Sequence, residues 1–199
     1  MTQNDMEPSF NEKYRQILLT GKDLFFKHGI KRVTVEEICR ESGVSKMTFY
    51  KHFSNKIELV KRIVDMLVSE NLTKYREVMK RNDISYEEKV RLTIQMKMEG
   101  TSEISDAFYD DYLVQNDPVL ASYIQIQSGN VFGEILKDYI EAQERGDIRK
   151  DIKPEFILYF LNHIMDLAKD ENLLMLYEHP WEVIMELVNF FFYGIMNRK

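Results

Sequence analysis

The segment TVEEICRESGVSKMTFYKHF, residues 34–53, constrains the fold more than any other part of the chain. Thr34 and Ser45 are residue types that cap helix N-termini, because a hydroxyl oxygen can accept a hydrogen bond from a backbone N–H of the first turn. Gly43 lies between them, where a tight turn can use backbone angles that a Cβ would hinder. The spacing therefore predicts two short helices joined by a tight turn, the helix-turn-helix arrangement.

Two short helices cannot bury their own apolar faces, so this unit needs neighbouring helices. A helix over residues 12–28 is predicted before it, with apolar residues at three- and four-residue spacing and Gly29 as its stop. A long amphipathic helix is predicted after it, from the cap residue Asn55 to about Lys80. Cys39 supplies the small side chain needed where the short helices cross, and the residues predicted to face inward are Ile38, Val44 and Phe49.

The remaining chain has the pattern of further helices. The whole chain contains only 8 Gly and 4 Pro, too few for the turns of an all-β fold. Helices are predicted from Ser85 to near Gly100, within residues 104–115, from Pro118 to Gly146, and after Pro154 and Pro180. We therefore expect an all-α fold: a three-helix helix-turn-helix domain over residues 1–54, continued by the start of a connecting helix to about residue 62, and a C-terminal helical domain over residues 55–199.

Charge is distributed unevenly between the two parts of the chain. Residues 1–62 contain 12 Lys and Arg against 8 Asp and Glu, a balance of +4. From residue 63 onward there are 15 against 25, a balance of −10, and the two parts together give the net charge of −6. A basic head on an acidic body would direct its head toward duplex DNA, because phosphates attract the first and repel the second.

The second short helix is predicted to expose a row of hydrogen-bond donors. A lysine such as Lys46 can donate to guanine O6 and N7, and Met47 can lie against a thymine methyl group. Polar side chains from Thr48 to Lys56 are suited to phosphates, which position a helix without reading sequence. Taken singly, a lysine or threonine here is better explained as a solvated side chain. Together with the caps, the turn and the core, they favour DNA binding.

Residues 17–62 resemble the DNA-binding domain of the tetracycline-repressor (TetR) family. Cys39 stands where the family usually has alanine, a small-for-small replacement. The resemblance implies a homodimeric repressor whose two heads enter successive major grooves and which a small molecule releases from its operator. The residues that carry the resemblance are Gly21-x-x-Leu24-Phe25 with Gly29, Thr34-Val35-x-x-Ile38, Gly43-Val44-Ser45, Thr48-Phe49-Tyr50-x-His52-Phe53 and Lys56-x-x-Leu59.

The same resemblance implies roles for individual residues. The positions that match Lys46, Met47 and Lys51 read bases in the family. The positions that match four further residues hold phosphates: Thr48, Tyr50, His52 and Lys56. The complete set that we predict to bind DNA is Thr34, Val35, Ser45, Lys46, Met47, Thr48, Tyr50, Lys51, His52 and Lys56.

The last predicted helix, after Pro180, is too apolar for a one-sided surface helix. It includes three consecutive phenylalanines, residues 190–192, which must point in three directions. We expect the helices after Pro154 and Pro180 to pair with their two-fold mates in a four-helix bundle, although a helix buried inside one domain would show the same pattern. The residues predicted for this interface are Phe160, Ile184, Leu187, Phe191, Phe192 and Ile195.

Aromatic residues and methionines in the C-terminal part could line a cavity for a small effector. Interspersed acids would suit an apolar or a cationic molecule, the latter through cation–π contacts. The plain alternative is that these residues form ordinary core. The predicted pocket residues are Met96, Phe108, Tyr112, Tyr123, Phe132, Tyr159 and His163.

Two other functional classes are open to this sequence. An enzyme could use His163 and Asp166, but their spacing aligns only two ligands where a metal site needs three or four, and no nucleophile or phosphate-loop signature is present. A helical adaptor could keep the fold without binding DNA. No cofactor is expected, Cys39 is the one cysteine, and without a signal-peptide pattern or membrane span we expect a cytoplasmic location.

Overall fold

The computed structural model describes residues 3–101, 104–113 and 117–196. Within these ranges the chain is helical and contains no β-strand, which confirms the predicted all-α class. The helices are α1 (Gln3–His28), α2 (Val35–Glu41), α3 (Lys46–His52), α4 (Lys56–Met79), α5 (Tyr86–Thr101), α6 (Asp106–Leu113), α7 (Pro118–Arg145), α8 (Pro154–Leu167), α9 (Glu171–Leu174) and α10 (Pro180–Ile195). None of the described helices combines the length and the apolar character needed to span a membrane.

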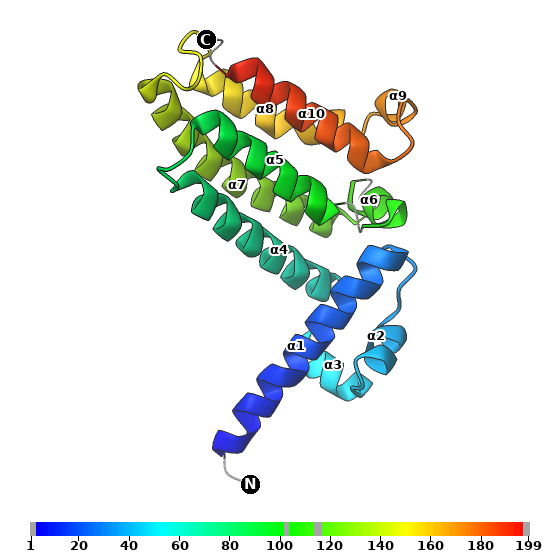
Figure 1. Cartoon of the computed structure of the whole chain (residues 1–199). Helices are drawn as coiled ribbons and strands as arrows, with labels where there is room; N and C mark the ends of the chain where they lie inside the picture. Colours follow the sequence, from blue (N-terminus) through cyan, green and yellow to red (C-terminus); the bar gives the residue numbers. More distant parts are fainter. Residues whose placement is uncertain (1–2, 102–103, 114–116, 197–199) are drawn as a thin grey trace.

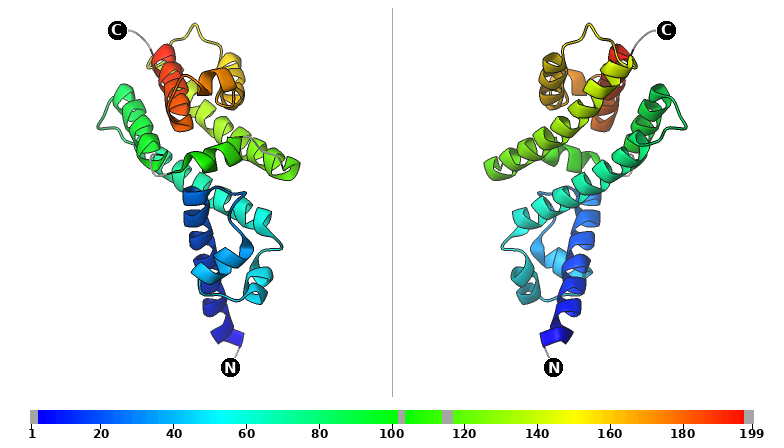
Figure 2. Two further views of the ribbon diagram at one scale, coloured as in Figure 1. Left: turned by 90° about the vertical axis from the view of Figure 1, so that its right-hand side faces the viewer. Right: turned by 90° about the vertical axis from the view of Figure 1, so that its left-hand side faces the viewer.

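The helices form a head and a body (Figure 1). Helices α1, α2 and α3 make the head, and α4 runs from the head along the body, where it packs against α5 and α7. Helix α8 packs on α7, and α10 packs on α5 and α6. The two side views in Figure 2 place the N-terminal end of α1 and the C-terminal end of α10 at opposite extremes of the molecule.

The predicted caps form as expected. The side chains of Thr34, Ser45 and Asn55 accept hydrogen bonds from backbone N–H groups in the first turns of α2, α3 and α4, at 3.2, 3.1 and 2.9 Å. Asp117 likewise accepts from the first turn of α7, at 2.9 and 3.1 Å. Gly43 has a φ of +68°, the left-handed conformation that the tight turn requires.

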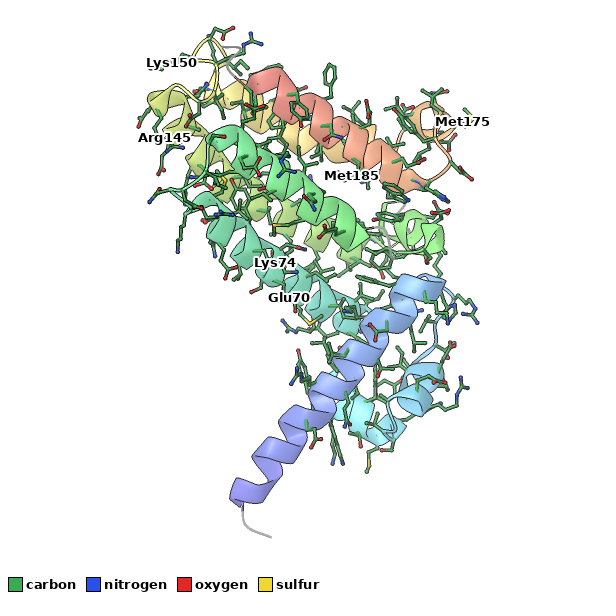
Figure 3. The ribbon with its side chains drawn as sticks, viewed as in Figure 1. Glu70, Lys74, Arg145, Lys150, Met175 and Met185 are labelled. Carbon is green, nitrogen blue, oxygen red and sulfur yellow. The ribbon has the colours of Figure 1, made fainter. Side chains whose placement is uncertain are left out.

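Two helical features were not predicted. Helix α1 begins at Gln3 rather than near residue 12, because the polar first residues carry no apolar periodicity that would indicate a helix. Helix α9 is a single turn capped by Asp170, whose carboxylate accepts from the N–H groups of two following residues at 2.9 and 3.1 Å. A one-turn helix is too short to show a periodic pattern. Met175, the residue after α9, lies at the edge of the body (Figure 3).

The core of the head continues into the body. Phe49 and Phe53 from the head are buried together with Leu59 from the start of α4. The same cluster includes Phe108 from α6 and Leu120 from α7. Head and body therefore share one apolar core across the point where the chain passes from α3 to α4.

A second core lies at the far end of the body, where α5, α7, α8 and α10 meet. Tyr139, Ile148 and Ile157 are among its fully buried side chains. Gln143 is the buried polar residue beside them, and its amide nitrogen donates to the carbonyls of Arg149 and Ile152 at 2.9 and 2.7 Å. This amide fixes the loop between α7 and α8, since an unpaired buried amide would be costly.

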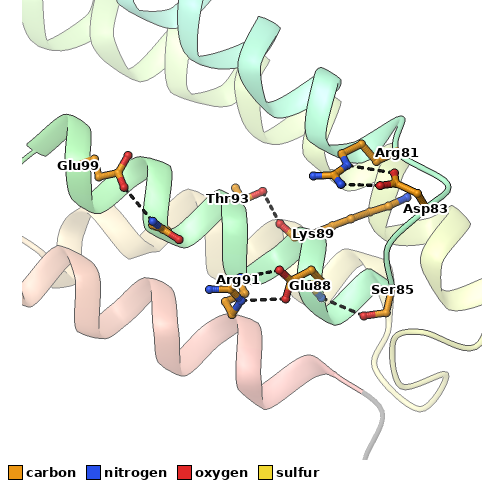
Figure 4. Close-up of polar contacts among 9 residues, drawn as sticks. Arg81, Asp83, Ser85, Glu88, Lys89, Arg91, Thr93 and Glu99 are labelled. Atoms are coloured by element: carbon orange, nitrogen blue, oxygen red, sulfur yellow. Dashed lines mark hydrogen bonds and ion pairs between the residues drawn. The ribbon is translucent and has the colours of Figure 1, made fainter.

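The turn between α4 and α5 is closed by charged side chains (Figure 4). Arg81 pairs with Asp83 at 2.5 Å, and Arg91 pairs with Glu88 on the first turn of α5 at 2.5 Å. Lys89 donates to the last carbonyl of α4, that of Met79, at 2.9 Å. These three cations therefore have partners within the turn and the adjoining helix ends.

The aromatic pattern of α10 differs from expectation. Phe191 is 6% exposed and stacks on Phe160 at 5.1 Å between ring centroids, and Ile195 is buried in the same core. Phe190 is 76% exposed. The prediction that Phe191 and Ile195 face a partner is therefore wrong: one residue is a rotation of about 100° on a helix, and Phe190 is the ring that points outward.

Lys56 also differs from expectation. Its ammonium donates to the carbonyls of Ile30, Lys31 and Val33, at 2.8, 3.2 and 2.9 Å, in the loop between α1 and α2. Burial lowers the pKa of Lys56, and the nearby Asp111 carboxylate opposes that shift. All three hydrogens of the ammonium are used on this loop, and the role of Lys56 as a phosphate contact stays a prediction.

Replacing Lys56 with Met tests this internal role. We expect Lys56→Met to lower the free energy of unfolding by about 2 kcal/mol, because three loop carbonyls lose a charged donor. Lys51→Met is the matched control: Lys51 is exposed on α3, and its loss should change stability by less than about 0.5 kcal/mol. Urea denaturation monitored by circular dichroism gives both values. Equal values for the two variants would contradict the internal role.

Candidate nucleic-acid interface

Helix α3 has one buried and one open side. Phe49 is fully buried in the head core, and its N–H and that of Phe53 continue the helix hydrogen bonding. Met47 and Tyr50 point the other way and are 69% and 55% exposed. An apolar methionine with this exposure has no packing role in the chain, so the open side of α3 is available to a partner.

Lys46, the first residue of α3, forms an ion pair with Glu36 on α2. Both side chains are largely exposed, 56% and 62% respectively. The mutual hydrogen bond raises the pKa of Lys46 and lowers that of Glu36. Both groups are therefore charged at neutral pH, and the pair adds a carboxylate to the predicted basic surface.

The hydroxyls of Ser45 and Thr48 lie 2.9 Å apart, and the Ser45 oxygen also caps α3. Lys51 is exposed on the same helix. Thr34 is exposed at the start of α2, whereas Val35 is half-buried against the head core. The exposed members of the predicted set thus gather on the starts of α2 and α3 and along the open side of α3.

His52 is half-buried at the end of α3. Its ring lies 5.8 Å from the ring of Tyr14 in an edge-on contact, so α1 supports it. Burial, followed by the nearby charges of Lys13 and Lys51, lowers its pKa. The imidazole is therefore neutral at neutral pH, and a contact with phosphate through it would be a hydrogen bond without a full charge.

A seam between the head and α6 was not predicted. Asp111 accepts a hydrogen bond from the N–H of Lys31 at 2.8 Å, and the ammonium of Lys31 lies 3.4 Å from the same carboxylate. A Cβ on Gly29 would lie 2.8 Å from Asp111 Oδ2 and 3.0 Å from a backbone oxygen of α6. The N–H of Ser105 donates to the carbonyl of Phe26 at 2.9 Å. No sequence pattern links residues this far apart along the chain.

The residues predicted to line an effector pocket are distributed over several parts of the body. Phe108 is buried in the first core with Tyr112 and Tyr123 beside it, and the Tyr123 hydroxyl donates to Asp65. Phe132 belongs to the second core, and Met96 is half-buried on α5. Tyr159 and His163 instead line an open groove. The single pocket expected from these seven residues stays a prediction.

The groove lies along α8 and has a volume of about 450 Å³. The ring of His163 stacks on that of Tyr159 at 4.1 Å, and its Nδ1 lies 2.7 Å from the Tyr159 carbonyl oxygen. Asp166 lies at the same groove. Among the described residues, no group of three or more His, Cys, Asp or Glu side chains is arranged to hold a metal ion.

A match to a known protein family covers the part of the chain that carries this surface. The family described as "Bacterial regulatory proteins, tetR family" matches residues 17–63, from α1 to the first half of α4. An uncharacterised HTH-type transcriptional regulator of Bacillus subtilis, YerO, is 34% identical over 68 residues, 34% of this chain and 24% of the relative. The HTH-type transcriptional regulator TtgR of Pseudomonas putida is 38% identical over 56 residues, 28% of this chain and 27% of the relative.

The chain thus matches about a quarter of the length of these curated relatives. Similarity of the fold extends further. The fatty acid degradation regulator FadR of Bacillus halodurans superposes with a TM-score of 0.69 at 17% identity, over 94% of this chain and 97% of that one. The matched head, with its capped helices and open α3 face, is thus similar to bacterial regulatory proteins of the TetR family.

Proposed function

We propose that the chain is a DNA-binding transcriptional repressor that acts as a homodimer and is released from its operator by a small molecule. The observation that carries the proposal is the open side of α3, where Met47 and Tyr50 are exposed beside charged Lys46 and Lys51. A helix of this kind enters a major groove with its first residues on base edges. Lys46, Met47 and Lys51 are the proposed base contacts.

The proposed phosphate contacts are Thr34, Ser45, Thr48, Tyr50 and His52. Their hydroxyl and imidazole groups are suited to phosphate oxygens, which fix the register of a protein on a duplex without reading sequence. Val35 completes the proposed surface through its position at the start of α2. Lys56 contributes indirectly, by fixing the loop that leads into α2.

Tyr50→Phe tests the phosphate role. We expect duplex binding to weaken about fivefold for every sequence tried, because one hydrogen bond is lost while the ring remains. The measurement is fluorescence anisotropy with the duplex upstream of the chain's own gene and with an unrelated duplex. Tyr177→Phe, at an exposed tyrosine between α9 and α10, should bind like the unaltered chain. Loss confined to one duplex would contradict the phosphate role, and absence of any salt-dependent binding would refute DNA binding itself.

Exposed aromatic residues on α8 and α10 support the proposed dimer. Phe156 and Tyr159 on α8 and Phe190 and Tyr193 on α10 are each more than half exposed. The two helices are neighbours, because a ring of α8 stacks on a ring of α10. Exposed aromatic rings on adjacent helices are typical of a surface that a partner covers. With them we retain in the proposed interface the half-buried residues Phe160, Ile184, Leu187 and Phe192.

A charge placed on this surface should separate the subunits. We expect Phe190→Glu to give monomers in sedimentation velocity, because a carboxylate would be buried without a partner in the dimer. Ile126→Glu is the control, since Ile126 is 62% exposed on α7, away from the proposed interface. A Phe190→Glu variant that remains a dimer at micromolar concentration would refute this interface.

For the effector we propose a site between α4, α5 and α7. The hydroxyls of Tyr75 and Tyr86 are buried; that of Tyr75 interacts with the Asp138 carboxylate, and that of Tyr86 has no hydrogen-bond partner among the described residues. Burial, together with the nearby Asp138 carboxylate, raises the pKa of both phenols, and burial also raises the pKa of Asp138. A buried hydroxyl without a partner is costly, so a ligand that pairs with the Tyr86 hydroxyl would bind favourably. Aromatic rings around a carboxylate suit an organic cation.

Thermal melting can test this site with benzyltrimethylammonium and its neutral isostere neopentylbenzene. We expect the cation to raise the melting temperature of the unaltered chain, because it binds the folded state. Asp138→Asn should abolish the shift, whereas Glu141→Gln, on the exposed side of the same helix, should retain it. A shift with the neutral compound alone would favour an apolar effector. No shift with either compound would refute the site.

We retain residues 1–54 as the proposed DNA-binding domain and residues 55–199 as the proposed effector and dimerisation domain. The two alternative functions have less support. An adaptor without DNA binding leaves the exposed cations of α3 unexplained, and an enzyme based on His163 and Asp166 lacks a third converging group among the described residues.

A further inference from the structure

The ion pair between Glu36 and Lys46 places a carboxylate inside the proposed DNA-binding surface. Glu36 lies on α2 and Lys46 on α3, so the pair joins the two helices of the motif across their open side. Both side chains are more than half exposed, which makes them accessible to a duplex. An exposed ion pair of this kind contributes little to stability, so its placement calls for another explanation.

A carboxylate at this position is unfavourable for general duplex binding. It faces the negative charge of phosphates, and it partly neutralises a lysine that could otherwise attract them. On the same helix, Glu37 is half-buried, and Glu41, at the C-terminal end, is paired with Arg40 at 3.1 Å, outside α3. Glu36 is therefore the acid that reaches the recognition helix, and it weakens DNA binding unless a base donates a hydrogen bond to it.

The major-groove edge of a G·C pair offers such a donor. Guanine presents two acceptors, N7 and O6, to which a lysine donates, and cytosine presents the N4 amino group, which a glutamate accepts. The donor lies directly beside the two acceptors, as Glu36 lies beside Lys46. In an A·T pair the adenine N6 donor lies between two acceptors, N7 and thymine O4. A carboxylate that accepts from N6 would therefore lie next to an acceptor on each side, N7 and O4. The single lysine could donate to one of these acceptors and would leave the other facing the carboxylate.

We propose that Glu36 and Lys46 act as one unit that reads a single G·C pair in each operator half-site. Lys46 donates to guanine and Glu36 accepts from the N4 amino group of the paired cytosine. Glu36 is thus a specificity-determining residue: it excludes sequences that lack the cytosine donor. This inference rests on the proposed function, since it requires that α3 enter the major groove.

The first experiment is selection of binding sites from random duplex DNA by the full-length chain, followed by sequencing. The variants are Glu36→Ala, Glu36→Gln and Lys46→Ala, with Glu41→Ala as a matched acid control on the same helix. The unaltered chain and Glu41→Ala should select sites with an invariant G·C pair in each half. Glu36→Ala and Lys46→Ala should lose preference at that one position and retain the rest of the site.

Glu36→Gln should shift the preference at this position toward A·T, because a glutamine amide pairs with adenine N6 and N7. Anisotropy titrations on duplexes that differ at this pair alone quantify the effect. We expect the unaltered chain to prefer G·C over A·T by at least about 10-fold, in the range for one specific base contact. In Glu36→Ala the preference should fall below about threefold, with weaker binding to the G·C duplex.

The outcomes separate this inference from the proposed function. In one outcome, the unaltered chain selects a defined site in which the Glu36 and Lys46 variants do not lose preference at one shared G·C pair. In that outcome the chain binds DNA, but the proposal that Glu36 and Lys46 read one base pair together is wrong. If Glu36→Ala binds every duplex more tightly, Glu36 acts by repulsion alone, which also overturns the inference. If the unaltered chain selects no site, the proposed function fails with it.

Discussion

The loop between α1 and α2 determines where the recognition surface lies, and charged groups hold it from two sides. The ammonium of Lys56, at the start of α4, donates to three of its carbonyls, and the carboxylate of Asp111, on α6, accepts the N–H of Lys31. Helix α2 starts directly after this loop, and α3 packs on α2. The orientation of α3 therefore depends on hydrogen bonds whose donors and acceptors come from α4 and α6.

This arrangement makes the head sensitive to the body. The first core contains residues of α1, α3, α4, α6 and α7, so these helices cannot shift independently without opening it. At the other end of α6, Asp106 lies 3.1 Å from the Nδ1 of His179, the residue before α10, and this contact raises the pKa of His179. Contacts thus run continuously from the start of α10 through α6 to the loop before α2. An effector that moved α6 would therefore change both the contact of Asp106 with His179 and the contact of Asp111 with the loop before α2.

Sequence patterns within a few residues predicted the helices of the head. They could not predict contacts between segments that are far apart along the chain. Caps such as Ser45 and Asn55 act within three residues, so the sequence alone reveals them. Lys56 and Lys51 look alike in sequence, but only the folded loop shows that Lys56 is used internally. Phe190 and Phe191 differ by one position in a run of three phenylalanines, where periodicity cannot rank neighbouring faces. The pairing of Glu36 with Lys46 depends on how two helices cross.

The three glycines with positive φ meet different demands. At Gly43 and Gly146 a Cβ would have no heavy atom within 4 Å, so the backbone conformation alone favours glycine there. Asparagine, which tolerates left-handed angles, is an acceptable substitute at these two positions. At Gly29 the Asp111 carboxylate and an α6 carbonyl occupy the space as well. In homologues that keep this seam, Gly29 should be invariant while the other two positions drift, so variation at Gly29 would mark relatives that join head and body differently.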